Sequence, residues 1–232
     1  MRLAALSALL FAAAASADEG KHLFILAGQS NMGGLRPEES FTPAVETAFG
    51  ADRVIVVKDA HGGQPIRRWV TDYQTLLDRK VDNVGDLYPE LMDKVRKAIE
   101  GETIASVTFV WMQGERDANE RLAGVYETAL ERLVAQVAKD LGRDRVNVVV
   151  GRLSDFGLKT PRGQWPELRA AQEAFADARE DAVWVDTDDL NTGKNRRGKE
   201  VVDDLHLSAE GYKVLGQRFA DAAIQLVKDG DS

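Results

Sequence analysis

The sequence lacks cysteine altogether and has only three histidines among its 232 residues. Without cysteine the chain can form neither a disulfide bond nor a thiolate metal site, and its N-terminus cannot carry a lipid on cysteine. The histidines and the scattered carboxylates show no recognisable metal-ligand spacing. We therefore expect no metal ion and no cofactor.

Basic residues are also in short supply, with 30 Lys and Arg against 38 Asp and Glu and a formal net charge of −8. The densest basic stretch, "GKNRRGKE" (193–200), is predicted to be a solvated loop. Nucleic acids and anionic membranes require clustered positive charge, so we expect neither as a partner. "GQSNMGG" also lacks the glycine spacing of a phosphate-binding loop. The sequence gives no indication of oligomeric state.

The longest apolar stretch lies in the first 17 residues, "MRLAALSALLFAAAASA". This stretch has Arg2, a Leu- and Ala-rich segment and a closing Ala15-Ser16-Ala17, which is the order of parts in a secretory signal peptide. It is shorter than the roughly 20 residues that cross a membrane as a helix. We expect a secreted or periplasmic protein with one domain over 18–232 and no membrane contact after cleavage.

Five apolar runs are continuous rather than alternating, which is typical of strands buried on both faces. They span 22–28, 53–60, 106–114, 145–153 and 182–187. Helical periodicity occupies 86–101, 121–142, 165–179 and 208–227. The alternation predicts an α/β fold, a three-layer α/β/α sandwich with a five-stranded parallel sheet. The longer connections, where a site would be built, are 33–50, 61–84, 154–165 and 188–205.

Ligands of open parallel sheets bind beyond the carboxyl ends of the strands, so the residues that follow each strand are the candidates. After three of the predicted strands, and before the last helix, come Gln29-Ser30-Asn31, His61-Gly62-Gly63-Gln64, Gln113-Gly114-Glu115-Arg116-Asp117 and "DDLHLS" (203–208).

A serine becomes a nucleophile when an imidazole accepts its proton and a carboxylate orients the imidazole. His206, with Asp203 three residues before it, has a spacing that allows such a pair. The same "DDLHLS" could equally be only the capped start of a helix. His61 lies at the correct edge, with Asp59 as its neighbour on the same face, whereas His22 lies at the far end and is predicted to be a surface residue.

Taken together and in order, five stretches resemble the motif blocks of the SGNH (GDSL-like) hydrolase superfamily: "GQSNMGG", "HGGQPIRRW", "WMQGERDA", "WPELRAAQ" and "DDLHLSAEG". The Gln-Ser-Asn and Trp-x-Gln-Gly-Glu forms are similar to its sialate O-acetylesterase-like branch, which includes carbohydrate esterase family six. The resemblance implies a flavodoxin-like SGNH hydrolase fold and a serine esterase that removes O-acetyl groups from carbohydrates through an acetyl-serine intermediate. Two alternatives stay open: a general acyl-ester hydrolase of the GDSL lipase type, and a catalytically silent carbohydrate-binding module.

Carried over to this sequence, the resemblance implies Ser30 as nucleophile, His206 as general base and then acid, and Asp203 as its orienting carboxylate. It also implies an oxyanion hole that consists of the Ser30 N–H, a glycine N–H and the Gln113 side chain. Gly62 is the first choice for the glycine and Gly63 the second. Gln29, Asn31 and Glu115 are expected to support these groups. In this branch the second block usually reads Gly-Gly-Thr, and here Gln64 replaces the threonine.

Three further expectations concern the same regions. Glu115 and Asp117 could instead be the paired carboxylates of a glycosidase, although a separation of two residues cannot show that they flank a sugar bond. Trp69 and Trp165 could offer faces for stacking sugars, while Trp111 is predicted to be structural. The small residues around Ser30 are expected to let substrate and backbone donors approach its hydroxyl.

Overall fold

The computed structural model describes residues 20–159 and 162–230. The predicted signal peptide, 1–17, lies outside these residues. Among the helices that are described, none combines the length and the apolar character needed to cross a membrane.

Five parallel strands form the central sheet in the order β2-β1-β3-β4-β5. The strands are β1 (Lys21–Gly28), β2 (Val54–Ala60), β3 (Ile104–Met112), β4 (Asn147–Gly151) and β5 (Ala182–Val185). All five lie within two residues of their predicted starts, and the predicted α/β class with its parallel sheet is confirmed. Continuous apolar runs could reveal these strands because both faces of the sheet are covered.

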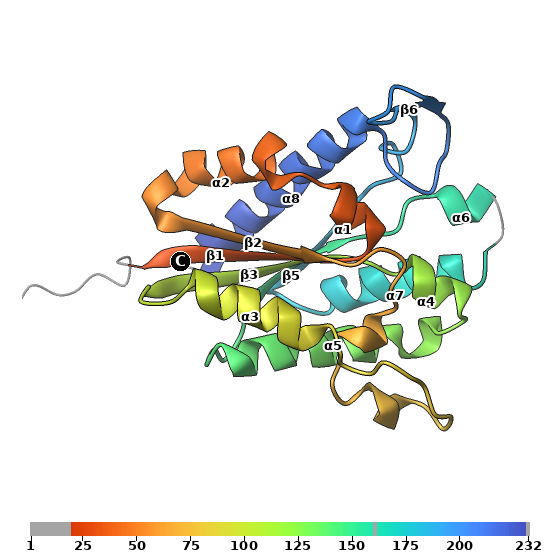
Figure 1. Ribbon diagram of the computed structural model, residues 1–232, viewed down its shortest axis with the longest axis horizontal. Coiled ribbons are helices and arrows are strands. Elements are labelled where there is room, and N and C mark those ends of the chain that lie inside the picture. The colour runs from red at the N-terminus through yellow and green to blue at the C-terminus, as the bar shows by residue number, and fades with distance from the viewer. Residues whose placement is uncertain (1–19, 160–161, 231–232) are drawn as a thin grey trace, which may run out of the picture.

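Helices cover both faces of the sheet (Figure 1). On one face lie α1 (Ser30–Gly34), α2 (Phe41–Phe49) and α8 (Ala209–Gly230), and on the other α3 (Tyr88–Ala98), α5 (Ala123–Asp140) and α7 (Trp165–Asp177). A hydrophobic core lies on each face of the sheet. Alternate side chains of β1 pack into the two cores, with Leu23 and Ile25 in one and Phe24 and Leu26 in the other. Shorter elements are α4 (Glu115–Asn119), α6 (Phe156–Lys159), the 3-10 turns Pro37–Glu39, Ala51–Arg53, Ile66–Arg68 and Tyr73–Leu76, and the strands β6 (Gly193–Lys194) and β7 (Glu200–Val201).

Two segments that were predicted to be plain connections carry structure of their own. The stretch 33–50 contains α2, which buries only Phe41 and Val45 and therefore shows little helical periodicity in the sequence. The ends of the basic stretch 193–200 pair as the antiparallel strands β6 and β7. Arg196 within it forms an ion pair with Glu39 at 2.8 Å, so this loop is tied to the segment that follows α1.

His22 and two tryptophans are buried, which differs from what the sequence suggested. His22 is 3% exposed and its Nδ1 lies 2.8 Å from Ser106 Oγ, so its prediction as a surface residue is wrong. Trp69 and Trp165 are at most 1% exposed, so neither offers a face for sugar stacking. Trp111 is fully buried in the core, as predicted.

The strand order places a topological switch point between β1 and β3, because the chain leaves β1 toward β2 on one side and returns to β3 on the other. Ligand crevices of open α/β sheets lie at such points, beyond the carboxyl ends of the strands. Ser30 follows β1 and Gln113 follows β3. The fold therefore brings the first and third motif blocks to the switch point.

Candidate active site

Ser30 is the first residue of α1 and follows β1 with only Gln29 between them. Its side chain is partly exposed, and within the described residues neither its Oγ nor its backbone N–H has a hydrogen-bond partner. Gly28 makes this turn possible, since its φ is +148° and a Cβ there would lie 2.0 Å from the Met112 carbonyl oxygen. A polar group without a partner at a switch point is free to meet a ligand.

Gly62 lies beside Ser30 in the loop that follows β2. A Cβ built on Gly62 would be 3.9 Å from the Ser30 Cβ, whereas a Cβ on Gly63 would meet nothing within 4 Å. No described residue accepts a hydrogen bond from the Gly62 N–H. Gln64, the departure from the usual threonine, donates its Nε2 to the Gly62 carbonyl at 3.1 Å and so braces the turn. The Ser30 and Gly62 residues thus lie side by side, and the backbone N–H of each is unpaired within the described structure.

His206 and Asp203 lie on the loop before α8, and in the described structure no hydrogen bond or ion pair joins their side chains. The His206 side chain is exposed and no described residue bonds to it, while its backbone N–H donates to Asp204 Oδ1 at 3.2 Å. Asp203 accepts from Lys159 Nζ at 2.7 Å, and its φ of +47° is unusual for a residue other than glycine. In this structure the Asp203 carboxylate, which was predicted to orient His206, therefore pairs with Lys159 instead.

Asn31 ties this loop to the end of β1. Its Nδ2 donates to the Leu205 carbonyl at 3.1 Å, and its Oδ1 accepts from the Leu207 N–H at 3.4 Å. Leu205 and Leu207 are the neighbours of His206, and Asn31 is the neighbour of Ser30. The first and last motif blocks, more than 170 residues apart, are brought together through these bonds.

Gln113, which was predicted to donate a hydrogen bond to the oxyanion, is buried inside the protein. It is fully buried, and its Nε2 lies 2.6 Å from Asp117 Oδ2, 3.0 Å from the Gln64 carbonyl and 3.2 Å from Gln29 Oε1. An amide nitrogen has two hydrogens, so the protein's own acceptors already occupy both. Gln113 therefore braces the Gln64 turn and Gln29, and its donation to an oxyanion stays a prediction.

The two acidic residues of "QGERD" are sealed in the protein. Glu115 is 3% exposed and accepts from Asn31 Nδ2 at 2.8 Å, and Asp117 is fully buried and also accepts from the Ile66 N–H at 2.9 Å. Burial raises the pKa of Glu115, and it raises the pKa of Asp117 to about 7. Carboxyl groups without access to solvent cannot flank a sugar bond, which argues against the glycosidase alternative.

Replacing Asp117 by asparagine should stabilise the protein at pH 8 but not at pH 4. Because the pKa of Asp117 is raised by folding from its ordinary value of 3.8 to about 7, folding favours the protonated form, and stability falls as the pH rises between these values. Asparagine removes this loss, which amounts to about 4 kcal/mol. Urea unfolding at both pH values measures the difference.

Asp93→Asn provides the control for this prediction, because the Asp93 side chain is 78% exposed and its loss should change neither value appreciably. An Asp117→Asn variant with the same stability gain at both pH values would show that the buried carboxyl does not titrate as described.

A second histidine and carboxylate pair lies at the same sheet edge. His61 Nε2 is 3.1 Å from Asp59 Oδ2 and 3.9 Å from Glu90 Oε2, and these three residues could offer ligand atoms to a metal ion. Lys94 Nζ, however, donates to Asp59 at 2.5 Å and to Glu90 at 2.9 Å. The ammonium group already supplies the positive charge that this cluster requires.

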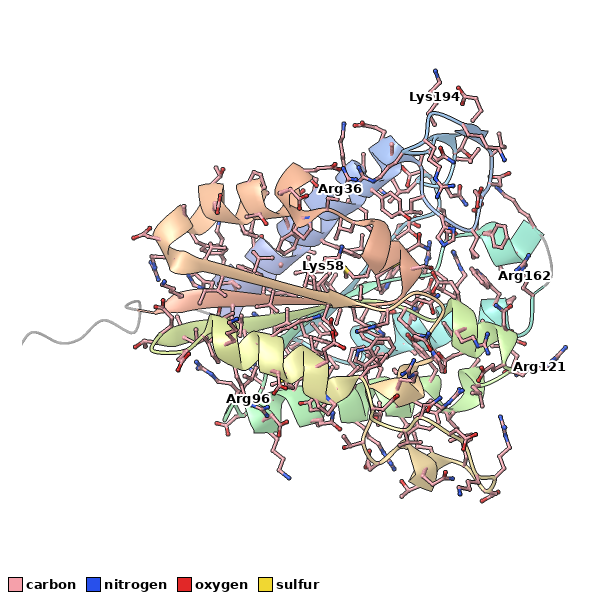
Figure 2. All side chains as sticks on the ribbon, in the orientation of Figure 1. Arg36, Lys58, Arg96, Arg121, Arg162 and Lys194 are labelled. Carbon is pink, nitrogen blue, oxygen red and sulfur yellow. The ribbon has the colours of Figure 1, made fainter. Side chains whose placement is uncertain are left out.

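Lys58 connects β2 to the turn after α1, where Figure 2 labels it together with Arg36. Its Nζ donates to the carbonyls of Gly33, at 3.1 Å, and of Leu35. Burial lowers the pKa of Lys58. The backbone that follows Ser30 is thus fixed from β2 as well as from the His206 loop.

Two residues near the site gave no recognisable signal in the sequence. Tyr212, from α8, donates its hydroxyl to Asn31 Oδ1 at 3.1 Å, and Lys159, from α6, holds Asp203. Tyr212 lies in an ordinary helical pattern and Lys159 in a stretch read as a loop. Only the fold shows that they reach the motif residues.

Comparison with known proteins identifies the family. The sequence model described as "Carbohydrate esterase, sialic acid-specific acetylesterase" matches residues 33–225, which include all motif blocks except the one that contains Ser30. A search of curated proteins gives no match.

Solved structures of similar fold include a protein from Arabidopsis thaliana, with 20% identity and a TM-score of 0.67 over 89% of this chain and 98% of that one. A carbohydrate acetylesterase from Xanthomonas citri has 17% identity and a TM-score of 0.60, over 90% of this chain and 57% of that one. A carbohydrate acetylesterase family member from Sinorhizobium meliloti has 16% identity and a TM-score of 0.54, over 90% and 99%. These likenesses support the fold, and the family match covers most of the chain. The chain therefore belongs to the carbohydrate esterase, sialic acid-specific acetylesterase family, and it is an esterase.

Proposed function

We propose that this esterase removes O-acetyl groups from carbohydrates, with Ser30 as its nucleophile. The observation that carries the proposal is the free Ser30 hydroxyl at the switch point, beside the unpaired N–H groups of Ser30 and Gly62. A nucleophile next to two backbone donors is the arrangement that acyl transfer requires.

In the first half-reaction, Ser30 Oγ attacks the carbonyl carbon of the acetyl group while the His206 imidazole takes the hydroxyl proton. The negative charge that develops on the carbonyl oxygen is stabilised by the N–H groups of Ser30 and Gly62. The bond between the acetyl carbon and the sugar oxygen then breaks, and His206 returns the proton to that oxygen. The deacetylated sugar leaves, and Ser30 is left acetylated.

In the second half-reaction, His206 takes a proton from water, and the resulting hydroxide oxygen attacks the acetyl carbon of acetyl-Ser30. The same two N–H groups stabilise the charge. The ester bond to Ser30 breaks, Oγ regains the proton from His206, and acetic acid leaves and loses its remaining proton to solvent to become acetate.

Asp203 orients His206 in this proposal, and to do so its carboxylate must turn from Lys159 to the imidazole Nδ1. The Lys159 and Asp203 side chains are 50% and 42% exposed. Water screens exposed ion pairs, so breaking this one costs little. Because the rotation is inexpensive, the observed contact is compatible with an orienting role in the complex with substrate.

Acetate release tests the substrate class. We expect the protein to release acetate from acetylated xylan or from an O-acetylated sialoside, and to prefer acetyl over octanoyl esters of one alcohol by about tenfold or more in kcat/KM. The physical reason is that long acyl chains need apolar surface, and in the described part of the chain only Leu158 and Val202 are exposed large hydrophobic residues.

The comparison of acyl lengths also addresses the lipase alternative. A preference for octanoyl esters would show a general acyl-ester hydrolase. Hydrolysis of aryl acetates without any release of acetate from either glycan would refute carbohydrates as the substrate class.

A further inference from the structure

The side-chain amide of Asn31 is fully satisfied by hydrogen bonds inside the protein. Nδ2 donates to Glu115 Oε1 at 2.8 Å and to the Leu205 carbonyl, while Oδ1 accepts from Tyr212 Oη and from the Leu207 N–H. A primary amide has two donor hydrogens and two acceptor lone pairs, and all four are used here. Asn31 as a whole is buried, with 3% of its surface exposed.

The four partners also fix which way the amide points. Two acceptors, from Glu115 and Leu205, face its nitrogen, and two donors, from Tyr212 and Leu207, face its oxygen. Turning the amide around would place oxygen against oxygen on one side, and a buried polar group without a partner is costly. The contacts therefore leave one orientation for the side chain.

This single orientation fixes the backbone on both sides of His206. Asn31 binds the carbonyl of the residue before the histidine and the N–H of the residue after it. The His206 N–H itself donates to Asp204 Oδ1 at 3.2 Å, a contact within the same loop. Since the imidazole is exposed and has no partner in the described structure, its distance from Ser30 depends on how well the backbone is held.

Tyr212 and Glu115 hold the amide from opposite sides. The Tyr212 ring packs against Gly34, where a Cβ would lie 2.3 Å from the ring, so the glycine admits the tyrosine. Burial raises the pKa of Tyr212 to about 12, which keeps its hydroxyl a donor over the working pH range. Glu115 reaches Asn31 from α4, at the far side of the switch point.

We propose that Asn31 is the positioning residue for the His206 base, and that Tyr212 and Glu115 act through it by fixing its amide. The proposal rests on the proposed function, because it assumes that His206 serves Ser30. Asn31 lies next to the nucleophile in sequence and holds the base through space, so one residue couples the two halves of the reaction centre.

Two substitutions test this with an aryl acetate, 4-nitrophenyl acetate, as the substrate. Tyr212→Phe removes one hydroxyl and keeps the ring, and we expect kcat to fall about tenfold with KM changed less than twofold. Asn31→Asp keeps the shape but places oxygen against the Glu115 and Leu205 oxygens, and we expect kcat to fall about 100-fold or more. Rates are expressed per active site, counted by labelling of the serine with a phosphonate.

Tyr88→Phe is the matched control. Tyr88 lies on α3, away from Ser30, and it is also buried with its hydroxyl donating to Asp140 at 3.0 Å. A structural role alone would give both tyrosine variants a similar loss of stability and an unchanged kcat. We expect kcat to fall only in Tyr212→Phe.

An unchanged kcat per labelled site in Tyr212→Phe would overturn the proposal, and this variant decides the question if Asn31→Asp does not fold. Failure of the proposed function gives a different result, namely a wild-type protein that hydrolyses no acetyl ester or that does so equally well without the Ser30 hydroxyl.

Discussion

Replacing Ser30 by alanine should lower the rate of acetate release by about 10⁴-fold or more, because the substitution removes the atom that forms the acyl intermediate. Within the described residues the Ser30 Oγ has no hydrogen-bond partner, so its loss leaves no buried group unsatisfied. The variant should therefore keep the stability of the wild type and still bind the glycan. Acetate assays and thermal unfolding measure the two properties.

Ser106→Ala is a suitable control for this experiment. Ser106 lies on β3 near the amino end of the sheet, and its hydroxyl is 2.8 Å from His22 Nδ1. We expect a modest loss of stability and an unchanged kcat. A Ser30→Ala variant that keeps more than about 1% of wild-type turnover would contradict the role of Ser30 as nucleophile.

The second large effect is expected at His206. Replacing it by alanine should lower kcat about 10³-fold or more, since no group would then take the proton of Ser30. His61→Ala should lower kcat less than threefold. The His61 imidazole contacts Asp59 and lies 3.9 Å from Glu90, and it is not on the loop that Asn31 holds beside Ser30. Steady-state kinetics of the two variants with one acetyl ester supply the comparison.

Comparing the two histidine variants shows which histidine, His206 or His61, is the general base. His61 already has a carboxylate partner, whereas His206 must acquire one from Asp203. If His61→Ala loses activity and His206→Ala retains it, the base is His61 with Asp59, and Asn31 then holds a loop without a catalytic role.

The sheet could be predicted from the sequence because its strands are buried on both faces. A run such as Leu23 to Ala27 has no polar interruption and admits few other interpretations. The helix α2 was missed because it has only nine residues, includes Pro43 and buries just two side chains. A short helix with little apolar surface leaves a weak periodic pattern.

The location of the candidate site was also predictable, since parallel strands deliver their carboxyl ends to one edge. Its internal contacts were not. The bond between Tyr212 and Asn31 joins residues 181 apart, and the contact of Asp203 with Lys159 depends on where α6 lies. Local spacing carries no information about either contact.

The glycines near Ser30 illustrate the same difference. They were expected to admit the substrate, but at two of them the protein itself fills the space that a side chain would take. Gly28 lies against the Met112 carbonyl, and Gly34 lies against the Tyr212 ring. A Cβ on Gly62 would face Ser30, whereas Gly33 and Gly63 have open space at that position. That the small residues let substrate and backbone donors reach the Ser30 hydroxyl stays a prediction, and only the fold could show which protein groups approach each glycine.

Mass spectrometry of the protein after brief acid quenching during turnover of an acetyl ester tests the central claim most directly. We expect the peptide that contains Ser30 to gain one acetyl group, and we expect this adduct to disappear when the substrate is exhausted. Acetate release without any acetylation of Ser30, or with acetylation of another residue that turns over at the same rate, would contradict the proposed mechanism.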